Sequence, residues 1–256
     1  MKSVFISHGA PTLPFEDVAA RRFLKGLGTA NPRPKAIVAV SAHWETRIPM
    51  VNAVERNGTI HDFYGFPSEL YEMSYPAPGS PLLAERIVDL LSDAGMTVGI
   101  DRYRGLDHGA WVPLSLAYPA ADIPVVQLSL QSHLGPGHHL ELGRALSALP
   151  EDDILIMASG SMTHDLSSWR GATDKEEPDW VTDFADWTDA ALRENRTCDL
   201  LAYRNAAPFA ERNHPTEEHF LPLFVALGAA GPQAKAQRIH SSTTYGVLRM
   251  DAYAFN

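Results

Sequence analysis

Histidines carry most of the chemistry that this sequence could perform. The chain has 11 of them, and three follow short runs of β-branched and apolar residues: His8, His43 and His164. In open α/β sheets, ligands bind at the carboxyl ends of the strands. One such histidine would usually be a hydrogen-bonded structural residue, but three at equivalent positions favour a functional cluster. Imidazole is a common metal ligand and can exchange protons near neutral pH.

His8 and His43 are the strongest candidates for metal ligands. His8 stands in SHGAP, where Gly9 allows a sharp turn and Pro11 fixes the direction in which the chain leaves. His43, in SAHWE, ends the next predicted strand, and consecutive strands are usually neighbours in space. We therefore expect the two imidazoles to converge on one metal ion.

A further ligand is expected from the string HPTEEHFLPL. A helix is predicted over 217–229, with Thr216 as its cap and acidic residues in its first turn. His219 would then lie in that first turn, and His214 lies five residues earlier. From the spacing alone, either histidine could face the cluster.

Three other histidines have informative surroundings. His108, in GLDHGAW, and His164, in SGSMTHDL, have small neighbours that leave room for a ligand, and both fit acid/base chemistry better than metal binding. His61 lies in the segment 59–79, which is rich in aromatics, Pro and Gly. That segment predicts an ordered loop over a site, with His61 in a pocket wall.

The elements that must position these residues indicate an α/β fold. Continuous apolar strands suit a sheet covered on both faces, and their alternation with helices is typical of an α/β fold. We expect a single domain over 1–256. The predicted strands are 3–7, 36–42, 123–130 and 154–159, and the predicted helices are 80–95, 138–149, 179–195 and 217–229.

Composition narrows the class of protein. A net charge of -10 without a Lys/Arg cluster argues against nucleic acid or an anionic membrane as partner. The expected partner is therefore a small molecule. No apolar run reaches the roughly 18 to 20 residues of a membrane span, so a cytoplasmic location is expected. The single cysteine, Cys198, is interpreted as structural. Phosphate-loop, dinucleotide-binding, CxxC and GxSxG motifs are all absent from the sequence.

Several strings together resemble a known enzyme family. The segments SHGAP, SAHW, TIHDFYGFP, YPAPGSP, LDHGAW, SGSMTHDL and HPTEEHFLPL are similar to those of class III extradiol ring-cleavage dioxygenases of the DOPA-dioxygenase type, in the LigB group. The resemblance spans residues 3 to about 228. It implies a single α/β domain with a central, mostly parallel sheet flanked by helices.

The resemblance also implies a role for each histidine. The family's metal ligands fall on His8, His43 and His219, and its catalytic acid/base falls on His164. His108 matches a second active-site histidine that contacts substrate or assists proton transfer. His214 occupies a position where some relatives carry Asn, so the resemblance favours His219 as the ligand. His214 is instead grouped with the pocket histidine of the aromatic loop as a possible substrate contact.

The family implies a non-haem Fe(II) site at which a catechol reacts with O2. Three neutral histidines also suit Zn2+, so the sequence leaves iron and zinc open. It also leaves open the identity of the catechol, the bond that is cleaved and the oligomeric state. Two other functions fit the same three histidines: a zinc hydrolase with a metal-activated water, and an inactive relative that binds a metal or small molecule.

Overall fold

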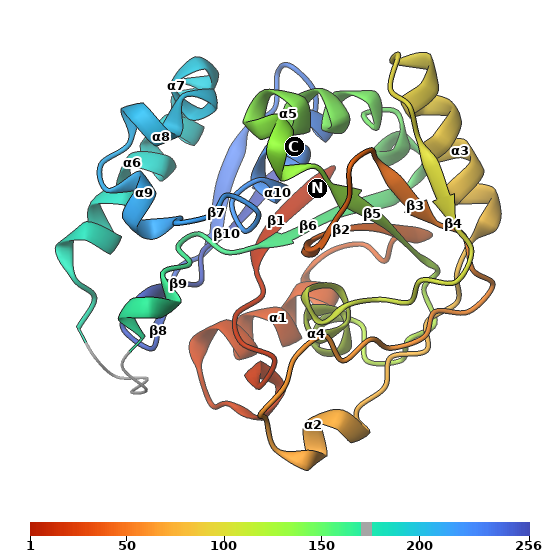
Figure 1. Ribbon diagram of the computed structural model, residues 1–256, viewed down its shortest axis with the longest axis horizontal. Helices are drawn as coiled ribbons and strands as arrows, with labels where there is room; N and C mark the ends of the chain where they lie inside the picture. Colours follow the sequence, from red (N-terminus) through yellow and green to blue (C-terminus); the bar gives the residue numbers. More distant parts are fainter. Residues whose placement is uncertain (170–175) are drawn as a thin grey trace.

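One large sheet organises the chain. The computed structural model describes residues 1–169 and 176–256. Its main sheet has eight strands in the order β4-β3-β5-β2-β6-β1-β10-β7, and Figure 1 shows it running through the middle of the molecule. The strands are β1 (Ser3–Ser7), β2 (Ala36–Glu45), β3 (Met50–Asn52), β4 (Gly99–Asp101), β5 (Val125–Leu130), β6 (Ile154–Gly160), β7 (Ala236–His240) and β10 (Ala252–Phe255).

The centre of this sheet is parallel. β1, β6, β2 and β5 pair in parallel, so their carboxyl ends meet at one edge. β10 and β7 add antiparallel strands beyond β1. β3 runs antiparallel to β5 and parallel to β4. A small hairpin forms a separate sheet. Its strands, β8 (Thr243–Thr244) and β9 (Leu248–Arg249), have two residues each.

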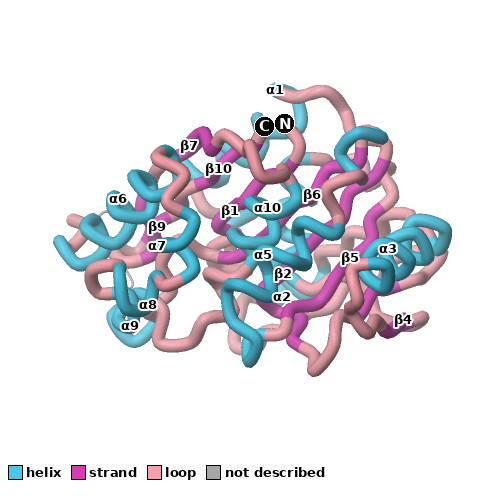
Figure 2. The backbone as a smooth tube through the Cα atoms, turned by 90° about the horizontal axis from the view of Figure 1, so that it is seen from above, coloured by secondary structure: helices cyan, strands magenta, loops and turns pink. Residues whose placement is uncertain are grey.

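Helices cover both faces of the sheet. One apolar cluster joins the sheet to α3 (Pro81–Asp93), α5 (Gly135–Ala145), α6 (Asp179–Arg193) and α10 (Pro222–Ala229). The opposite cluster involves α1 (Ala19–Ala30) and α4 (His108–Ala117). Figure 2 shows α5 and α10 lying across the middle of the sheet. The shorter helices are α2 (Ser68–Glu72), α7 (Thr197–Leu201), α8 (Tyr203–Ala206) and α9 (Ala210–Asn213).

This arrangement confirms the predicted fold class: a single α/β domain with a large, mostly parallel sheet flanked by helices. The four predicted strands are present. The second continues through Glu45, so His43 lies within the strand, two residues before its end. The Ser80 hydroxyl accepts a hydrogen bond from the Leu83 amide and caps α3, as the Ser start of that predicted helix suggests.

The predicted start of the last helix is wrong. α10 begins at Pro222, and the preceding residues, from Pro215 to Leu221, form turns. Pro222 fits the first turn of a helix because proline needs no amide hydrogen-bond partner there. Thr216 does not cap the helix, and its hydroxyl donates to Glu218 Oε1 instead. His219 therefore stands in an irregular turn before α10, not on the helix.

The described helices give no sign of a membrane span, because none of them is both long and apolar enough to cross a bilayer.

Candidate metal centre and active site

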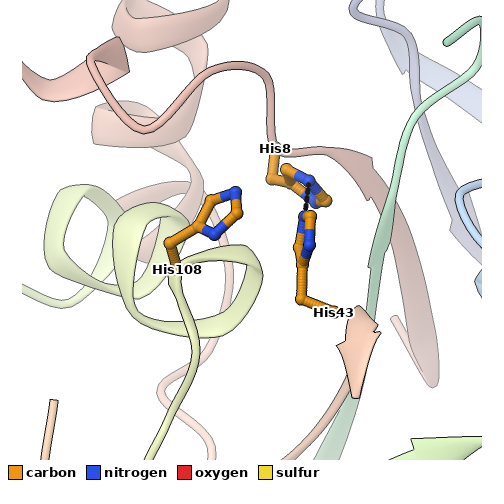
Figure 3. Close-up of side chains that lie close together, drawn as sticks. All are labelled: His8, His43 and His108. Carbon is orange, nitrogen blue, oxygen red and sulfur yellow. Dashed lines mark hydrogen bonds between the residues drawn. The ribbon is translucent and has the colours of Figure 1, made fainter. Parts of the chain in front are cut away.

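Five imidazoles meet at the carboxyl edge of the central strands. His8 follows β1, His43 lies at the end of β2, His108 begins α4, His164 follows β6, and His219 precedes α10. The ring centroids of His8 and His43 are 4.9 Å apart, and that of His219 lies 4.9 Å from His43. Figure 3 shows His8, His43 and His108 converging from three separate elements.

The His43 Nε2 atom lies close to the Nε2 atoms of two other rings. His43 Nε2 lies 3.0 Å from His8 Nε2 and 3.3 Å from His219 Nε2. Nitrogens bound to one divalent ion at about 2.1 Å, with bond angles of about 90° to 109°, lie about 3.0 to 3.4 Å apart. Both distances therefore fit nitrogens that share a metal ion with His43.

The remote nitrogens of two rings are held by acceptors. His8 Nδ1 lies 3.0 Å from Ser159 Oγ, and the Ser159 hydroxyl donates its own proton to the Gly109 carbonyl. Ser159 must therefore accept from His8 Nδ1. His219 Nδ1 donates to Glu218 Oε1 at 2.9 Å. Both contacts leave the Nε2 lone pair facing the centre, which is how metal-binding histidines are usually oriented.

Burial keeps the three rings neutral. Loss of solvent, followed by the charges of neighbouring imidazoles, lowers the pKa values of His8 and His219 well below the usual value of 6.5. The same causes lower the pKa of His43 to about 3. Metals bind the deprotonated imidazole, so at neutral pH the donor set is in the form that a divalent cation requires.

Two groups of possible metal donors lie at this site. Possible ligand atoms of His108 lie within 4.8 Å of those of His8 and His43, and His164, Glu218 and His219 form a similar group. The Glu218 carboxylate already accepts from the His219 ring and from a threonine. His8 and His43 can thus share an ion with a nitrogen of either His108 or His219.

His108 is tied to an aspartate of the aromatic loop. Its Nδ1 lies 3.0 Å from Asp62 Oδ2, and its backbone amide donates to Asp62 Oδ1 at 2.9 Å. Burial alone would raise the pKa of Asp62, but the hydrogen bonds and charge of His108 lower it overall. Asp62 Oδ2 also lies 3.9 Å from His43 Nδ1. The Asp62 carboxylate therefore pairs with His108 and lies near His43, and no motif in the sequence predicted this role for Asp62.

His164 lies beside the three converging rings. Its imidazole stacks on that of His219, with centroids 3.4 Å apart and planes inclined by 12°. The backbone amide of His164 donates to the Asn213 carbonyl, which fixes the loop after β6. Burial lowers the pKa of His164 to about 4, so the ring is a neutral proton acceptor at pH 7.

The other two predicted pocket histidines lie behind the site. His214 is fully buried, its Nε2 donates to the Met162 carbonyl at 2.9 Å, and its ring packs 4.9 Å from that of Phe220. His61 Nε2 donates to the Met73 carbonyl at 3.0 Å. Neither histidine is among the residues that line the cavity. His61 instead supports Phe63, whose ring lies 5.7 Å away.

A cavity of about 470 Å³ opens over the five clustered imidazoles. Aromatic side chains from the loop 59–79 form one wall, and residues after β6 and from the β8–β9 hairpin form another. The lining residues are His8, Gly9, Ala10, Pro11, Thr12, His43, Phe63, Phe66, His108, Ser161, His164, Leu166, Trp169, His219, Tyr245 and Leu248.

Comparison with known proteins assigns this architecture. Residues 4–255 match the family described as the catalytic LigB subunit of aromatic ring-opening dioxygenase. The chain belongs to this family. Its members are enzymes that open aromatic rings with O2, and metal dependence agrees with the cluster of imidazoles described above.

Relatives of known name extend over nearly the whole chain. A 4,5-DOPA dioxygenase extradiol of Beta vulgaris is 46% identical, covering 99% of this chain and 96% of the relative. One from Escherichia coli (strain K12) is 43% identical over 90% and 85% of the two chains. A crystal structure of an uncharacterized Escherichia coli K12 protein, 37% identical, superimposes with a TM-score of 0.80 and covers 98% of both chains.

The close packing of Gly109 leads to a prediction. A Cβ atom at this position would lie 2.4 Å from Ser41 Oγ and 2.9 Å from His43 Cδ2. We expect Gly109→Ala to displace the His43 ring and to weaken metal binding about 10- to 100-fold, as changes around metal ligands do. Competition with a chromophoric chelator measures this. Gly26→Ala is the control, because a Cβ there meets nothing within 4 Å; equal affinities of the two variants would contradict the prediction.

The lowered pKa values predict that the metal-free protein is unstable in acid. Burial lowers the pKa of His139 to about 4 and that of His214 to about 3, whereas both titrate near 6.5 when unfolded. Below pH 6.5 the unfolded chain therefore binds more protons, and the folded state loses stability as the pH falls. We expect the free energy of unfolding to drop by about 2 kcal/mol per such histidine between pH 7 and pH 5. Urea titrations with equal midpoints at the two pH values would contradict this.

Proposed function

We propose that this protein is a non-haem, metal-dependent extradiol dioxygenase that cleaves the ring of a catechol with O2. The observation that carries the proposal is the convergence of three neutral Nε2 atoms, 3.0 and 3.3 Å apart, beneath an aromatic cavity. Two further imidazoles, His108 and His164, line the same cavity. The family and the names of the relatives support this reaction class.

The proposed ligands are His8, His43 and His219. Three neutral imidazoles suit Fe(II) and also Zn2+, and we propose Fe(II) for turnover, with zinc as a metal that purified protein can acquire. When bound, the ion supplies Lewis-acid polarisation of the catechol oxygens and a path for electrons from the ring to O2.

His164 is the proposed acid/base. Its neutral ring lines the cavity next to His219, where it can accept a proton from a catechol hydroxyl and return it to the product. General acid/base groups of this kind contribute about 10²- to 10⁴-fold to a rate.

His108 is proposed to assist from the opposite side. Because its Nδ1 faces the Asp62 carboxylate, its Nε2 is left for the second catechol oxygen. The carboxylate would also stabilise His108 if the ring gained a proton during the reaction. Phe63 and Phe66 are proposed to exclude water from this side of the cavity and to hold the substrate ring.

Oxygen consumption tests the function directly. Protein loaded with Fe(II) under anaerobic conditions is mixed with a catechol and then with O2, using a panel that includes DOPA because the relatives carry that name. We expect one O2 to be consumed per catechol and a yellow semialdehyde-type product to form. Absence of oxygen uptake across the panel would contradict the proposal, as would hydrolysis of an ester or amide substrate without O2.

A further inference from the structure

Two hydroxyl groups of the cavity wall share one carboxylate. The side chains of Thr12 and Tyr245 both line the cavity over the imidazoles, and both hydroxyls donate to the same atom, Glu16 Oε1. Glu16 is half-buried and is not itself among the lining residues. A carboxylate therefore lies directly behind two polar groups of the wall.

The fold brings these three residues together from two segments. Thr12 and Glu16 flank the single 3-10 turn that follows β1, Leu13–Phe15, so the turn returns Glu16 to the side of Thr12. Tyr245 lies in the loop of the β8–β9 hairpin with a left-handed backbone, at a φ of 58°. Such a conformation costs energy in a residue other than glycine and persists where neighbouring contacts hold it. The bond to Glu16 and the edge-to-face contact with the Trp169 ring, with centroids 5.5 Å apart, hold Tyr245 in place.

The direction of these hydrogen bonds decides what the hydroxyls offer to a ligand. A hydroxyl has one proton and two lone pairs, and the protons of Thr12 and Tyr245 are used in the bonds to Glu16. Burial, followed by the bond to Glu16, raises the pKa of the Tyr245 phenol, so the phenol keeps its proton at neutral pH. Toward the cavity, the two oxygens can therefore only accept hydrogen bonds. We call them the acceptor pair.

The carboxylate suits the acceptor pair to a cation. Hydrogen bonds in a chain polarise one another, so a hydroxyl that donates to a carboxylate becomes a better acceptor. The negative charge of Glu16 is one hydrogen bond away from the wall, and an opposite charge at such short range favours the protonated form of an amine. An ammonium group has three donors and no acceptor, which matches a pair of oxygens that only accept.

The acceptor pair belongs to the same cavity as the imidazoles. Residues from Gly9 to Thr12 line the cavity in an unbroken run that starts at His8, and four residues span at most about 14 Å. The cavity volume of about 470 Å³ is in the range of sites that hold drug-sized ligands. One ligand can therefore contact the imidazoles and the acceptor pair together.

We propose that the hydroxyls of Thr12 and Tyr245, backed by the Glu16 carboxylate, select a protonated amine on the side chain of a catechol. This rests on the proposed catechol chemistry and adds to it the residues that recognise the side chain. The diol lies at the imidazoles, and the ammonium group donates to Thr12 Oγ1 and Tyr245 Oη. Glu16 acts through the two hydroxyls and is a positioning residue. A carboxylate on the same side chain is left to other parts of the site.

Equilibrium binding tests the acceptor pair without relying on turnover. Calorimetric titration of zinc-loaded protein, under anaerobic conditions, compares 4-(2-aminoethyl)catechol with 4-ethylcatechol, which lacks only the amine. We expect the amine to bind at least about tenfold more tightly, the usual effect of hydrogen bonds to a charged group. Equal dissociation constants for the two ligands would overturn the proposal.

Two variants and a control of matched charge assign the effect to these residues. Glu16→Gln keeps an oxygen for both hydroxyls but removes the charge, and Tyr245→Phe keeps the ring but removes one acceptor. Each should lower the preference for the amine about three- to tenfold, while 4-ethylcatechol binds as before. Asp17→Asn removes the same charge from the next residue, whose side chain is 88% exposed, and should retain the preference. Full retention by either Glu16→Gln or Tyr245→Phe, or an equal loss in Asp17→Asn, would overturn the proposal.

Oxygen uptake separates the acceptor pair from the proposed function. If the amine is preferred and the variants lose that preference, but the iron-loaded protein consumes no O2 with any catechol, the acceptor pair stands and the dioxygenase proposal fails. If O2 is consumed but the amine has no advantage in binding, only the acceptor pair fails.

Discussion

His219→Ala is expected to abolish tight metal binding. The variant leaves only the imidazoles of His8 and His43, whose Nε2 atoms lie 3.0 Å apart. Changes around metal ligands already cost 10- to 100-fold in affinity, so we expect the loss of a ligand itself to cost more than about 100-fold. Equilibrium dialysis against Zn2+ or anaerobic Fe(II), followed by elemental analysis, measures the affinity.

His214→Ala is the matched comparison. His214 lies five residues earlier and is also buried, but its Nε2 donates to the Met162 carbonyl and not toward the cluster. This variant should keep its metal while losing about 1 to 3 kcal/mol of stability, because a buried carbonyl is left without its donor. Loss of metal from His214→Ala together with full retention by His219→Ala would show that the ligand assignment is incorrect.

His164→Ala is expected to separate turnover from metal binding. The ring stacks on His219 but is not one of the three whose Nε2 atoms converge. We therefore expect one metal ion per chain to be retained and kcat to fall about 10²- to 10⁴-fold, the usual contribution of a general acid/base. Oxygen uptake by the Fe(II)-loaded variant gives the rate, and elemental analysis gives the metal content.

Added imidazole provides a further readout for His164. If the missing group only moves protons, free imidazole entering the space left by the alanine should restore part of the rate, and a structural defect would not respond in this way. Loss of metal from His164→Ala would instead support the neighbouring group of His164, Glu218 and His219, whose ligand atoms also lie within 4.8 Å of one another.

The sequence predicts the positions of His8 and His43 well for a physical reason. Both follow apolar runs that form buried parallel strands, and parallel strands bring their carboxyl ends to one edge. His219 could not be placed in the same way, because the turns between Pro215 and Pro222 lack a period that fixes which side chains face the site. The choice between it and His214 came from family resemblance; in the structure His219 Nε2 lies 3.3 Å from His43 Nε2, whereas His214 donates to the Met162 carbonyl.

Sequence patterns could not predict the residues that contact the clustered histidines from behind. Ser159, Asp62 and Glu218 hold the remote nitrogens of the clustered histidines or lie close to them, but short polar and acidic residues of this kind occur throughout the chain. Their roles depend on the tertiary contacts of β6, the aromatic loop and the turn before α10. The short strands β3, β4 and β7 were missed for a similar reason, since each has few residues and an incomplete apolar pattern.

An anomalous difference map tests the metal centre most directly. Crystals of protein loaded with one equivalent of Fe(II) or Zn2+ would be measured on both sides of the metal's absorption edge. The proposed centre predicts a single strong peak about 2.1 Å from the Nε2 atoms of His8, His43 and His219. A peak bonded to His108 in place of His219, or one held between His164 and Glu218, would contradict it.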